Sequence, residues 1–407
     1  MTNADFFEIR HCTHIEFLEV INTKQKKRSK MTLNFRRHEC NPLLGPDPKR
    51  PWGRDEARNP GVAFDGNTFH MVFTTSNKKT APEDDMTLGY AKSTDGVNFK
   101  VASEPFLPPS KNFDDFDFGT TEDTRITEFD GKFYIAYAGR SMKSHKFAKG
   151  ERRVGPNRNL NPTWTENYRR VGLAVTEDWK TVKRLGPITS EFLSDANVVL
   201  FPEKINGKYA FFHRPTVCLP WILTTKYCPA AMWLLYSSEM KCCASDKREM
   251  PWDMIDGTDI PDDKLLIQPT YSWEQNKLGA SGVPIPTDDG WLTFYHAVDR
   301  QGVYRVGLMM LDRSNPRKLI ARCDHPVFEP TVDYETNGIR AKQRCYPRCV
   351  FPTANLVVDD EIFMYYGSQD LYCCLATLKL KDAIDYVMKF RVRSMKKDIS
   401  KKIQIAL

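Results

Sequence analysis

Five short segments of the chain share one pattern of polar and hydrophobic positions. In each, a turn of acidic or small polar residues precedes alternating aromatic and apolar residues. The segments are 64–73, 129–137, 205–213, 288–296 and 358–366. Four of the turns contain Asp-Gly or Asn-Gly, the strongest short-range signal for a β-hairpin, because both turn residues must adopt positive φ. An apolar run before each turn supplies the other strand, so the pattern predicts five hairpins.

A further β-like run follows every hairpin. These runs are 86–93, 170–176, 232–238, 304–311 and 371–378. The first hydrophobic residue after each turn is residue 69, 133, 209, 291 or 362, so one unit spans 64 to 82 residues. This exceeds the ~40–45 residues of a WD40 blade, but it fits four strands with longer loops. The repeats predict an all-β fold, a five-bladed β-propeller over residues 33–378 that forms one catalytic domain. A β-sandwich with accidental repetition is the alternative.

Three segments lie outside this pattern. Residues 1–32 form an N-terminal extension, in which the apolar positions of 4–22 have a roughly helical period. Residues 379–407 form a C-terminal tail with a predicted helix in its first half. We expect short helical extensions at both ends, either of which could join two copies of the chain in a homo-oligomer. The polar insertion 142–168 is predicted to be a long functional loop.

Composition and charge narrow the class of protein. The chain is 41% hydrophobic and 27% charged, which is typical of a globular protein. Its net charge of +7 owes much to a basic stretch, 24–37, which we interpret as a solvated linker because no nucleic-acid-binding motif accompanies it. The apolar stretch 217–236 is broken by two prolines and a lysine, so neither a membrane nor a nucleic acid is expected as partner.

Cysteine usage indicates a reduced compartment. The eleven cysteines are an odd number, and two adjacent pairs, Cys242–Cys243 and Cys373–Cys374, suit a disulfide framework poorly. There is no Cys-x-x-Cys spacing for zinc, and the first residues lack the features of a signal peptide. We therefore expect a cytoplasmic protein without a bound metal or cofactor.

Candidate functional residues recur at equivalent points of the repeats. In a propeller the first strand of each blade lines the centre, so polar residues at the start of these strands, and at the end of the second strands, converge. Carboxylates among arginines, histidines and aromatic residues suit a sugar, and no HExxH, P-loop, GxGxxG or GxSxG motif is present. The predicted substrate-binding residues are Arg58, Asn59, Glu122, Arg125, Asn197, His213, Arg214, Tyr295, His296 and Asp370.

Eight segments in the right order resemble glycoside hydrolase family 130, which contains β-mannoside phosphorylases and β-mannosidases on five-bladed propellers. The segments are 37–42, 58–61, 122–127, 200–204, 213–215, 290–296, 334–338 and 365–370. The family's Glu-Asp-Pro-Arg is here Glu-Asp-Thr-Arg, so the resemblance implies that Asp123 is the catalytic acid. It also implies an inverting reaction on a small oligosaccharide, in which this acid protonates the glycosidic oxygen through a hydroxyl of the bound mannose.

The same resemblance bears on the reaction type. Phosphorylases of the family typically carry Arg-Asn shortly before Leu-Phe-Pro-Glu-Lys, where this chain has Ala196-Asn197. The missing arginine favours hydrolysis of β-mannosides at the non-reducing end. Glu274 is then the candidate base, since an inverting hydrolase needs a second carboxylate ~6.5–9.5 Å from the acid.

The remaining cations leave a second interpretation of the reaction type open. Arg140 and Lys204 are candidate anion contacts, so the alternative is a β-mannoside phosphorylase that uses inorganic phosphate as co-substrate and releases mannose 1-phosphate. A non-catalytic sugar-binding propeller is a third reading. The residues leave the linkage, β-1,2 or β-1,4, open.

Overall fold

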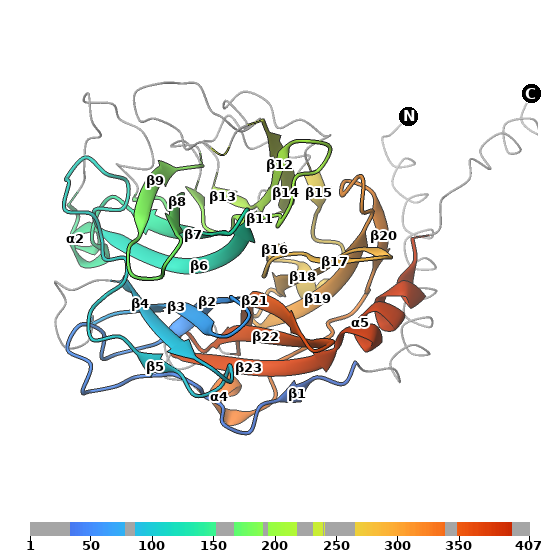
Figure 1. Cartoon of the computed structure of the whole chain (residues 1–407), viewed down its shortest axis with the longest axis horizontal. Helices are drawn as coiled ribbons and strands as arrows, with labels where there is room; N and C mark the ends of the chain where they lie inside the picture. Colours follow the sequence, from blue (N-terminus) through green and yellow to red (C-terminus); the bar gives the residue numbers. More distant parts are fainter. Residues whose placement is uncertain are drawn as a thin grey trace, which may run out of the picture. The chain divides into compact units, whose positions relative to one another are not determined.

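The computed structural model describes residues 33–77, 86–151, 167–189, 194–217, 231–238, 240, 265–337 and 348–392. The chain divides into two compact units, Met1–Asn34 and Phe35–Leu407. The second unit holds five antiparallel sheets arranged around a common centre, which confirms the predicted five-bladed β-propeller (Figure 1). The N-terminal segment 4–22 and the basic residues 24–32, on which predictions were made, lie outside the described residues.

Each blade is a sheet whose strands follow one another outward from the centre. Blade one is β2 (Arg58–Phe64), β3 (Phe69–Thr75), β4 (Thr87–Ser93) and β5 (Lys100–Val101). Blade two is β6 (Thr120–Phe129), β7 (Lys132–Arg140), β8 (Arg170–Thr176) and β9 (Lys183–Pro187). Blade three is β11 (Val199–Leu200), β12 (Tyr209–His213), β14 (Met232–Ser237) and β15 (Leu265–Ile267).

Blades four and five complete the ring. Blade four is β16 (Lys277–Ala280) and β17 (Ile285–Thr287), both paired with β18 (Gly290–Val298), then β19 (Tyr304–Leu311) and β20 (Leu319–Arg322). Blade five is β21 (Val350–Val358), β22 (Glu361–Ser368), β23 (Tyr372–Lys379) and, outermost, β1 (Arg36–Arg37). A separate pair joins β10 (Ser194–Asp195) to β13 (Pro215–Val217).

Three of the five predicted hairpin turns have the expected backbone, whereas in the turns at 65–66 and 289–290 only the glycine has positive φ. Both central residues adopt positive φ in the turns at 130–131, 206–207 and 359–360. This is the conformation that favours Asp, Asn and Gly, and it matches the twist of the flanking strands. The turn chemistry read from the sequence therefore fixes where the first strand of these blades ends.

One strand of blade five comes from the beginning of the propeller. β1 pairs with β23, with Arg36 opposite Thr377 and Arg37 opposite Ala376, so the two ends of the propeller are joined in one sheet. Arg37 fixes this closure by donating from Nε and Nη2 to the two carboxylate oxygens of Glu335, at 2.8 and 2.9 Å. The hydrophobic pattern did not predict this pairing, because the strand has only two residues.

The apolar core lies between neighbouring blades. Blades one and two share a cluster with Val72, Leu88, Ile126 and Ile135, and similar clusters join every other adjacent pair around the ring. Burial of large apolar side chains on both faces of each sheet is what holds the blades in place. The rigid ring fixes the ends of the innermost strands relative to one another.

The helices among the described residues are few and short. They are α2 (Ser144–Ala148), α4 (Asp333–Thr336) and α5 (Leu380–Val387), with 3₁₀ turns at Ser272–Glu274 and Met388–Phe390. The helix α5 lies within the predicted C-terminal helix, and α2 lies within the predicted loop 142–168, of which 152–166 fall outside the described residues. None of the helices in the described part of the chain is long and apolar enough to span a membrane.

Candidate active site

The innermost strands β2 and β6 both begin with an irregularity in the pairing register. The register shifts between Arg58 and Gly61 in one and between Glu122 and Arg125 in the other. Within these bulges Asn59 and Asp123 have φ of 50° and 56°, a conformation that Asn and Asp tolerate better than most residues. Bulges re-aim side chains and are common beside active sites.

The two bulges direct Asn59 and Asp123 toward each other. Nδ2 of Asn59 donates to Oδ1 of Asp123 at 2.6 Å, and both residues are almost fully buried. Gly367 on β22 allows this approach, because a Cβ at that position would lie 1.9 Å from Oδ1 of Asn59. The backbone N–H of Asp123 donates to Oγ1 of Thr74 at 2.9 Å. The carboxylate predicted to be the catalytic acid is therefore rigidly placed.

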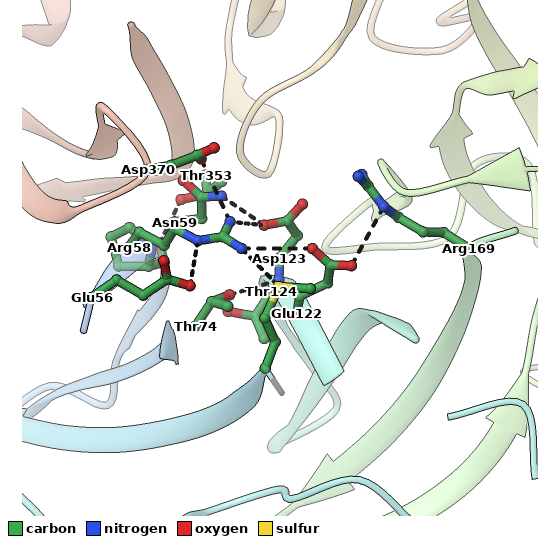
Figure 2. A network of polar contacts seen from close by, with 12 residues as sticks. Glu56, Arg58, Asn59, Thr74, Glu122, Asp123, Thr124, Arg169, Thr353 and Asp370 are labelled. Carbon is green, nitrogen blue, oxygen red and sulfur yellow. Dashed lines mark hydrogen bonds and ion pairs between the residues drawn. The ribbon is translucent and has the colours of Figure 1, made fainter. Parts of the chain in front are cut away.

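Arg58 lies at the centre of four carboxylates (Figure 2). Its guanidinium is 3.2 Å from both Glu56 and Asp123, 3.6 Å from Asp370 and 3.7 Å from Glu122. Burial alone would lower the pKa of Arg58, but the carboxylates, Glu56 foremost, raise it well above its usual value. Arg58 is a permanent cation whose charge is already balanced, so it positions the carboxylates and is a poor anion site.

Glu122 connects this network to two further arginines. Its Oε1 lies 3.4 Å from Nε of Arg140 and 3.4 Å from Nε of Arg169. Arg140 also donates to the backbone oxygen of Asn167 at 2.6 Å. Figure 2 shows Arg58 and Arg169 on opposite sides of Glu122. Arg169 is a site residue that the sequence analysis missed, because it lies outside the recognised segments.

Arg125 crosses the centre of the propeller. Its Nε donates to the backbone oxygen of Ser281 in blade four and its Nη1 to that of Asp123, both at 3.2 Å. The guanidinium lies 5.2 Å from the ring centre of Phe351 in blade five. Burial, with Arg214 nearby, lowers the pKa of Arg125 to about 10. Its Nη2 is buried without a hydrogen-bond partner in the described structure.

A second buried group comes from blade three. Nδ1 of His213 and Oδ2 of Asp195 are 2.8 Å apart, and Oδ1 of Asp195 accepts from the backbone N–H of Asn197 at 3.2 Å. Nε2 of His213 and Oδ1 of Asn197 are buried and have no hydrogen-bond partner among the described residues. Unpaired buried polar atoms are costly, which makes these two atoms candidates for binding the hydroxyls of a ligand. Asp195 orients both residues, a role that the sequence analysis did not assign to it.

Arg214, His296 and Lys277 form a cluster of basic side chains at the end of the second strands. Nη1 of Arg214 lies 3.1 Å from Nε2 of His296, and Gly279 allows this, since a Cβ there would lie 3.0 Å from Cδ of Arg214. Burial and the neighbouring cations hold the pKa of His296 well below its usual value, so it is neutral at pH 7. Burial, then Arg214 and Arg169, lower the pKa of Lys277 to about 7.

Lys277 was missed by the sequence analysis. It lies two residues before Gly279, at the start of β16, and this short first half of the inner strand is not marked by a hairpin turn. Its ammonium lies 5.1 Å from the ring centre of Tyr304. Lys277 thus joins the predicted residues Arg214 and His296 through the pairing of β16 with β18.

Glu274 and Tyr295 are placed away from these groups, inside blade four. Oε1 of Glu274 accepts from the hydroxyl of Tyr295 at 2.9 Å and from Nη2 of Arg322 at 2.7 Å. Its Oε2 accepts from the backbone N–H groups of Thr270 and Tyr271, at 2.8 and 3.1 Å. Both Glu274 and Tyr295 are 0% exposed. These contacts favour structural roles over those of a base and a sugar contact, since a general base must reach a water.

Lys204 also lies apart from the other candidates. It is exposed near the turn between β11 and β12, and its ammonium is 4.5 Å from the ring centre of Tyr209. Tyr209 and His213 are opposite ends of β12, so Lys204 is at the far end of the blade from the polar network. Among the residues that the structure describes, no three His, Cys, Asp or Glu side chains gather as they would around a metal ion.

The fold and the site together define a five-bladed propeller with buried carboxylates and cations at the start of its inner strands. Residues 36–389 match the model of glycoside hydrolase family 130, which is described as β-1,4-mannooligosaccharide phosphorylase. The chain belongs to glycoside hydrolase family 130, as the resemblance in its sequence indicated.

Characterised relatives span nearly the same length. A 1,2-β-oligomannan phosphorylase from Thermoanaerobacter sp. (strain X514) is 30% identical over 354 residues, which cover 86% of this chain and 99% of that relative. A β-1,2-mannobiose phosphorylase from the same organism is 30% identical over 350 residues, covering 83% and 95%. These relatives are phosphorylases, which supports the alternative reading of the sequence better than hydrolysis.

Solved structures show the same fold. The β-1,2-mannobiose phosphorylase of Listeria innocua, in complex with β-1,2-mannobiose, superposes with a TM-score of 0.65 at 21% identity, covering 87% of this chain and 99% of that one. A structure described as showing that family 130 contains hydrolases that target β-1,2 mannosidic linkages in Candida mannan has a TM-score of 0.65 at 18% identity, covering 86% and 95%. At these identities the likeness shows the fold alone.

Proposed function

We propose that this protein is an inverting β-mannoside phosphorylase. It would transfer the non-reducing mannosyl group of a β-linked manno-oligosaccharide to inorganic phosphate and release α-mannose 1-phosphate. This replaces hydrolysis, which the sequence alone favoured. The observation that carries the proposal is the group of basic side chains formed by Arg214, Lys277 and Arg169 near the predicted acid.

Like charges held close together destabilise one another, and a bound anion relieves this cost. Burial is the largest cause of the lowered pKa of Lys277, about 7, and the like charges of Arg214 and Arg169 lower it further. Phosphate offers several oxygens to guanidinium and ammonium donors, which bind it with charge-assisted hydrogen bonds. Arg58 is not counted in this basic group, because the four carboxylates around it already balance its charge.

The position of Glu274 argues against hydrolysis. An inverting hydrolase needs a carboxylate that takes a proton from water, whereas phosphate is already a nucleophile and needs no base. Each oxygen of Glu274 accepts two hydrogen bonds inside blade four. With alanine at position 196, the proposed phosphate site lacks one cation that phosphorylases of the family typically have, but Arg214, Lys277 and Arg169 remain.

The buried network suggests how each group would act. Arg58 and Asn59 bind Oδ1 of Asp123, which keeps the acid oriented toward the substrate. The family resemblance implies that its proton reaches the glycosidic oxygen through a mannose hydroxyl. The unpaired atoms of Asn197 and His213 would bind other hydroxyls. As the glycosidic C1–O bond breaks, its electron pair stays with the protonated leaving oxygen, and a phosphate oxygen bonds to C1 from the opposite face.

We further propose a β-1,2 linkage for the substrate, supported by the names of the two relatives from Thermoanaerobacter. The reverse reaction tests both points. Incubated with α-mannose 1-phosphate and mannose, the enzyme should release phosphate and form a disaccharide, whose linkage NMR will identify as β-1,2. A hydrolase would form no disaccharide from this donor, and a β-1,4 product would refute the linkage alone.

A further inference from the structure

A tight turn in blade five carries Asp370, one of the predicted substrate-binding residues. Residues 368–371, the Asp370 turn, link β22 to β23, and the N–H of Leu371 donates to the backbone oxygen of Ser368 at 2.9 Å. Both central residues, Gln369 and Asp370, have a φ of 53°. Asp tolerates this left-handed conformation, whereas a longer side chain such as Gln adopts it at a cost. Such a backbone persists only where neighbouring contacts hold it.

The helix α4 supplies the contacts that hold the Asp370 turn. Nε2 of Gln369 donates to the backbone oxygen of Glu335 at 2.6 Å, and Oγ of Ser368 donates to that of Tyr334 at 2.5 Å. Gln369 is 1% exposed and Ser368 is fully buried. Two consecutive side chains of the turn are thus bound to two consecutive residues of the helix.

The helix α4 is itself anchored where the propeller closes. The buried carboxylate of Glu335 accepts from Nε of Arg37, from the hydroxyl of Tyr366 and from the N–H of Thr331, each at 2.8 Å. Arg37 belongs to β1, the outermost strand of blade five, and Tyr366 belongs to β22. The helix is therefore fixed to two strands of its own blade and is a firm support for the Asp370 turn.

The other side of the Asp370 turn meets the candidate active site. The carboxylate of Asp370 lies 3.6 Å from the guanidinium of Arg58, and the oxygen of Leu371 accepts from the N–H of Ala57 at 3.0 Å. Figure 2 shows Asp370 beside Arg58 and Asn59. Of the four carboxylates around Arg58, that of Asp370 is the most exposed, at 20% against 9% or less for the others. It is the one most accessible to a ligand.

We propose that Gln369 is a positioning residue, whose hydrogen bond to α4 holds the strained turn so that the carboxylate of Asp370 meets a hydroxyl of the bound mannoside. This inference rests on the proposed function, since it takes Asp370 as a contact of the sugar. Gln369 itself does not touch the substrate, so its effect must pass through Asp370. Its loss should weaken sugar binding and spare phosphate binding, because Arg214 and Lys277 belong to blades three and four.

Steady-state kinetics with β-1,2-mannobiose and phosphate test the role of the Gln369 amide. Gln369→Met keeps the length of the side chain and removes the donor. The oxygen of Glu335 still accepts from the N–H of Cys349 at 3.0 Å, so this variant should fold. Its KM for mannobiose should rise about 3- to 10-fold, the equivalent of one neutral hydrogen bond, while the KM for phosphate changes less than about twofold. Gln369→Gly, in which glycine adopts positive φ without strain, should show the same rise.

A double-mutant cycle with Asp370→Asn distinguishes positioning from general stabilisation. If Gln369 acts through Asp370, Gln369→Met should raise the KM for mannobiose less than about twofold once Asp370→Asn is present. An equal rise in both backgrounds would show that Gln369 acts elsewhere and would overturn the inference. A wild-type KM for mannobiose in either single variant would overturn it as well.

The matched control is Asn206→Gly. Asn206 also has a left-handed φ, 49°, and its side-chain amide donates to the backbone oxygen of Ser314 at 3.1 Å. It precedes β12 at the end opposite His213, so both KM values should stay within about twofold. A rise equal to that of Gln369→Gly would indicate a general loss of rigidity and contradict the assignment. The cycle can be measured with phosphate or water as acceptor, so a wild type that consumes mannobiose without phosphate would refute the phosphorylase alone.

Discussion

Replacing Asp123 by asparagine tests the role of the predicted acid with the smallest change in shape. The amide oxygen of the new side chain can still accept from Asn59 and Arg58, which bind Oδ1 of Asp123 at 2.6 and 3.2 Å. The proton that a carboxylic acid would deliver is lost. If Asp123 is the acid, Asp123→Asn should lower kcat by about 10²–10⁴-fold, the usual contribution of general acid catalysis.

The stability of this variant should change little. The hydrogen bond from Asn59 becomes a neutral one and that from Arg58 loses its anionic acceptor, a loss of about 1 kcal/mol or less each. The replacement also removes one of four carboxylates that crowd around Arg58, and the relief of their mutual repulsion offsets part of that loss. We therefore expect the free energy of unfolding to change by no more than about 1–2 kcal/mol.

Asp117→Asn provides the matched control. Asp117 is a buried carboxylate of the same blade, and its Oδ2 accepts from the hydroxyl of Tyr137 at 2.9 Å and from Nε of Arg184 at 3.0 Å. Its replacement should lower stability by about 1–3 kcal/mol with kcat within about threefold of wild type. The assay combines product release from β-1,2-mannobiose with denaturant unfolding of each variant.

Two results would refute the reasoning on Asp123. If Asp123→Asn keeps more than a tenth of the wild-type kcat, the carboxylate has a structural role and another group is the acid. If Asp123→Asn unfolds while Asp117→Asn is inactive but stable, the roles of the two carboxylates have been assigned the wrong way round.

The remaining predictions concern the residues on which the structure departs from the sequence analysis. Glu274→Gln leaves Arg322 without its charged partner, so we expect a loss of about 3 kcal/mol in unfolding free energy and less than tenfold in kcat; a stable variant that has lost hydrolysis would restore Glu274 as base. Because the pKa of Lys277 is about 7, its ammonium loses its proton as pH rises, and the site should then bind anions more weakly. The inhibition constant (Ki) of sulfate, measured as a competitor of phosphate, should therefore increase about tenfold between pH 7 and 8.5. Lys277→Arg should flatten this profile, and an unchanged slope would contradict the assignment. Lys204→Ala should leave the KM for phosphate within twofold, and a tenfold rise would place Lys204 in the anion site.

Much of the fold could be predicted because its signals are local. The alternation of apolar residues and the Asp-Gly and Asn-Gly turns define each hairpin by themselves, and positive φ at both residues of the turns at 130–131 and 206–207 agrees. The closing strand β1 could not be predicted in this way. Its two residues carry no periodic pattern, and only pairing with Thr377 and Ala376, at the other end of the propeller, makes them a strand.

The candidate site was harder to predict, since it depends on which end of a strand a residue occupies and on contacts distant in sequence. Glu274 follows Trp273 in what reads as an ordinary loop, and its partner Arg322 comes from the outermost strand of the same blade. Conversely, Lys277 and Arg169 carry no motif. The pairing of β16 with β18 brings Lys277 near Arg214, and Arg169, which immediately precedes β8, lies close enough to Lys277 to lower its pKa. The amino-acid sequence alone does not show that these residues meet in the folded protein.

The most direct test of phosphorolysis is the initial rate of β-1,2-mannobiose consumption as a function of inorganic phosphate, with both products quantified. We predict a rate that is near zero without phosphate and saturates as phosphate is added, with one α-mannose 1-phosphate and one mannose formed for each disaccharide consumed. A rate that does not depend on phosphate, with two mannose molecules formed from each disaccharide, would contradict the proposed function.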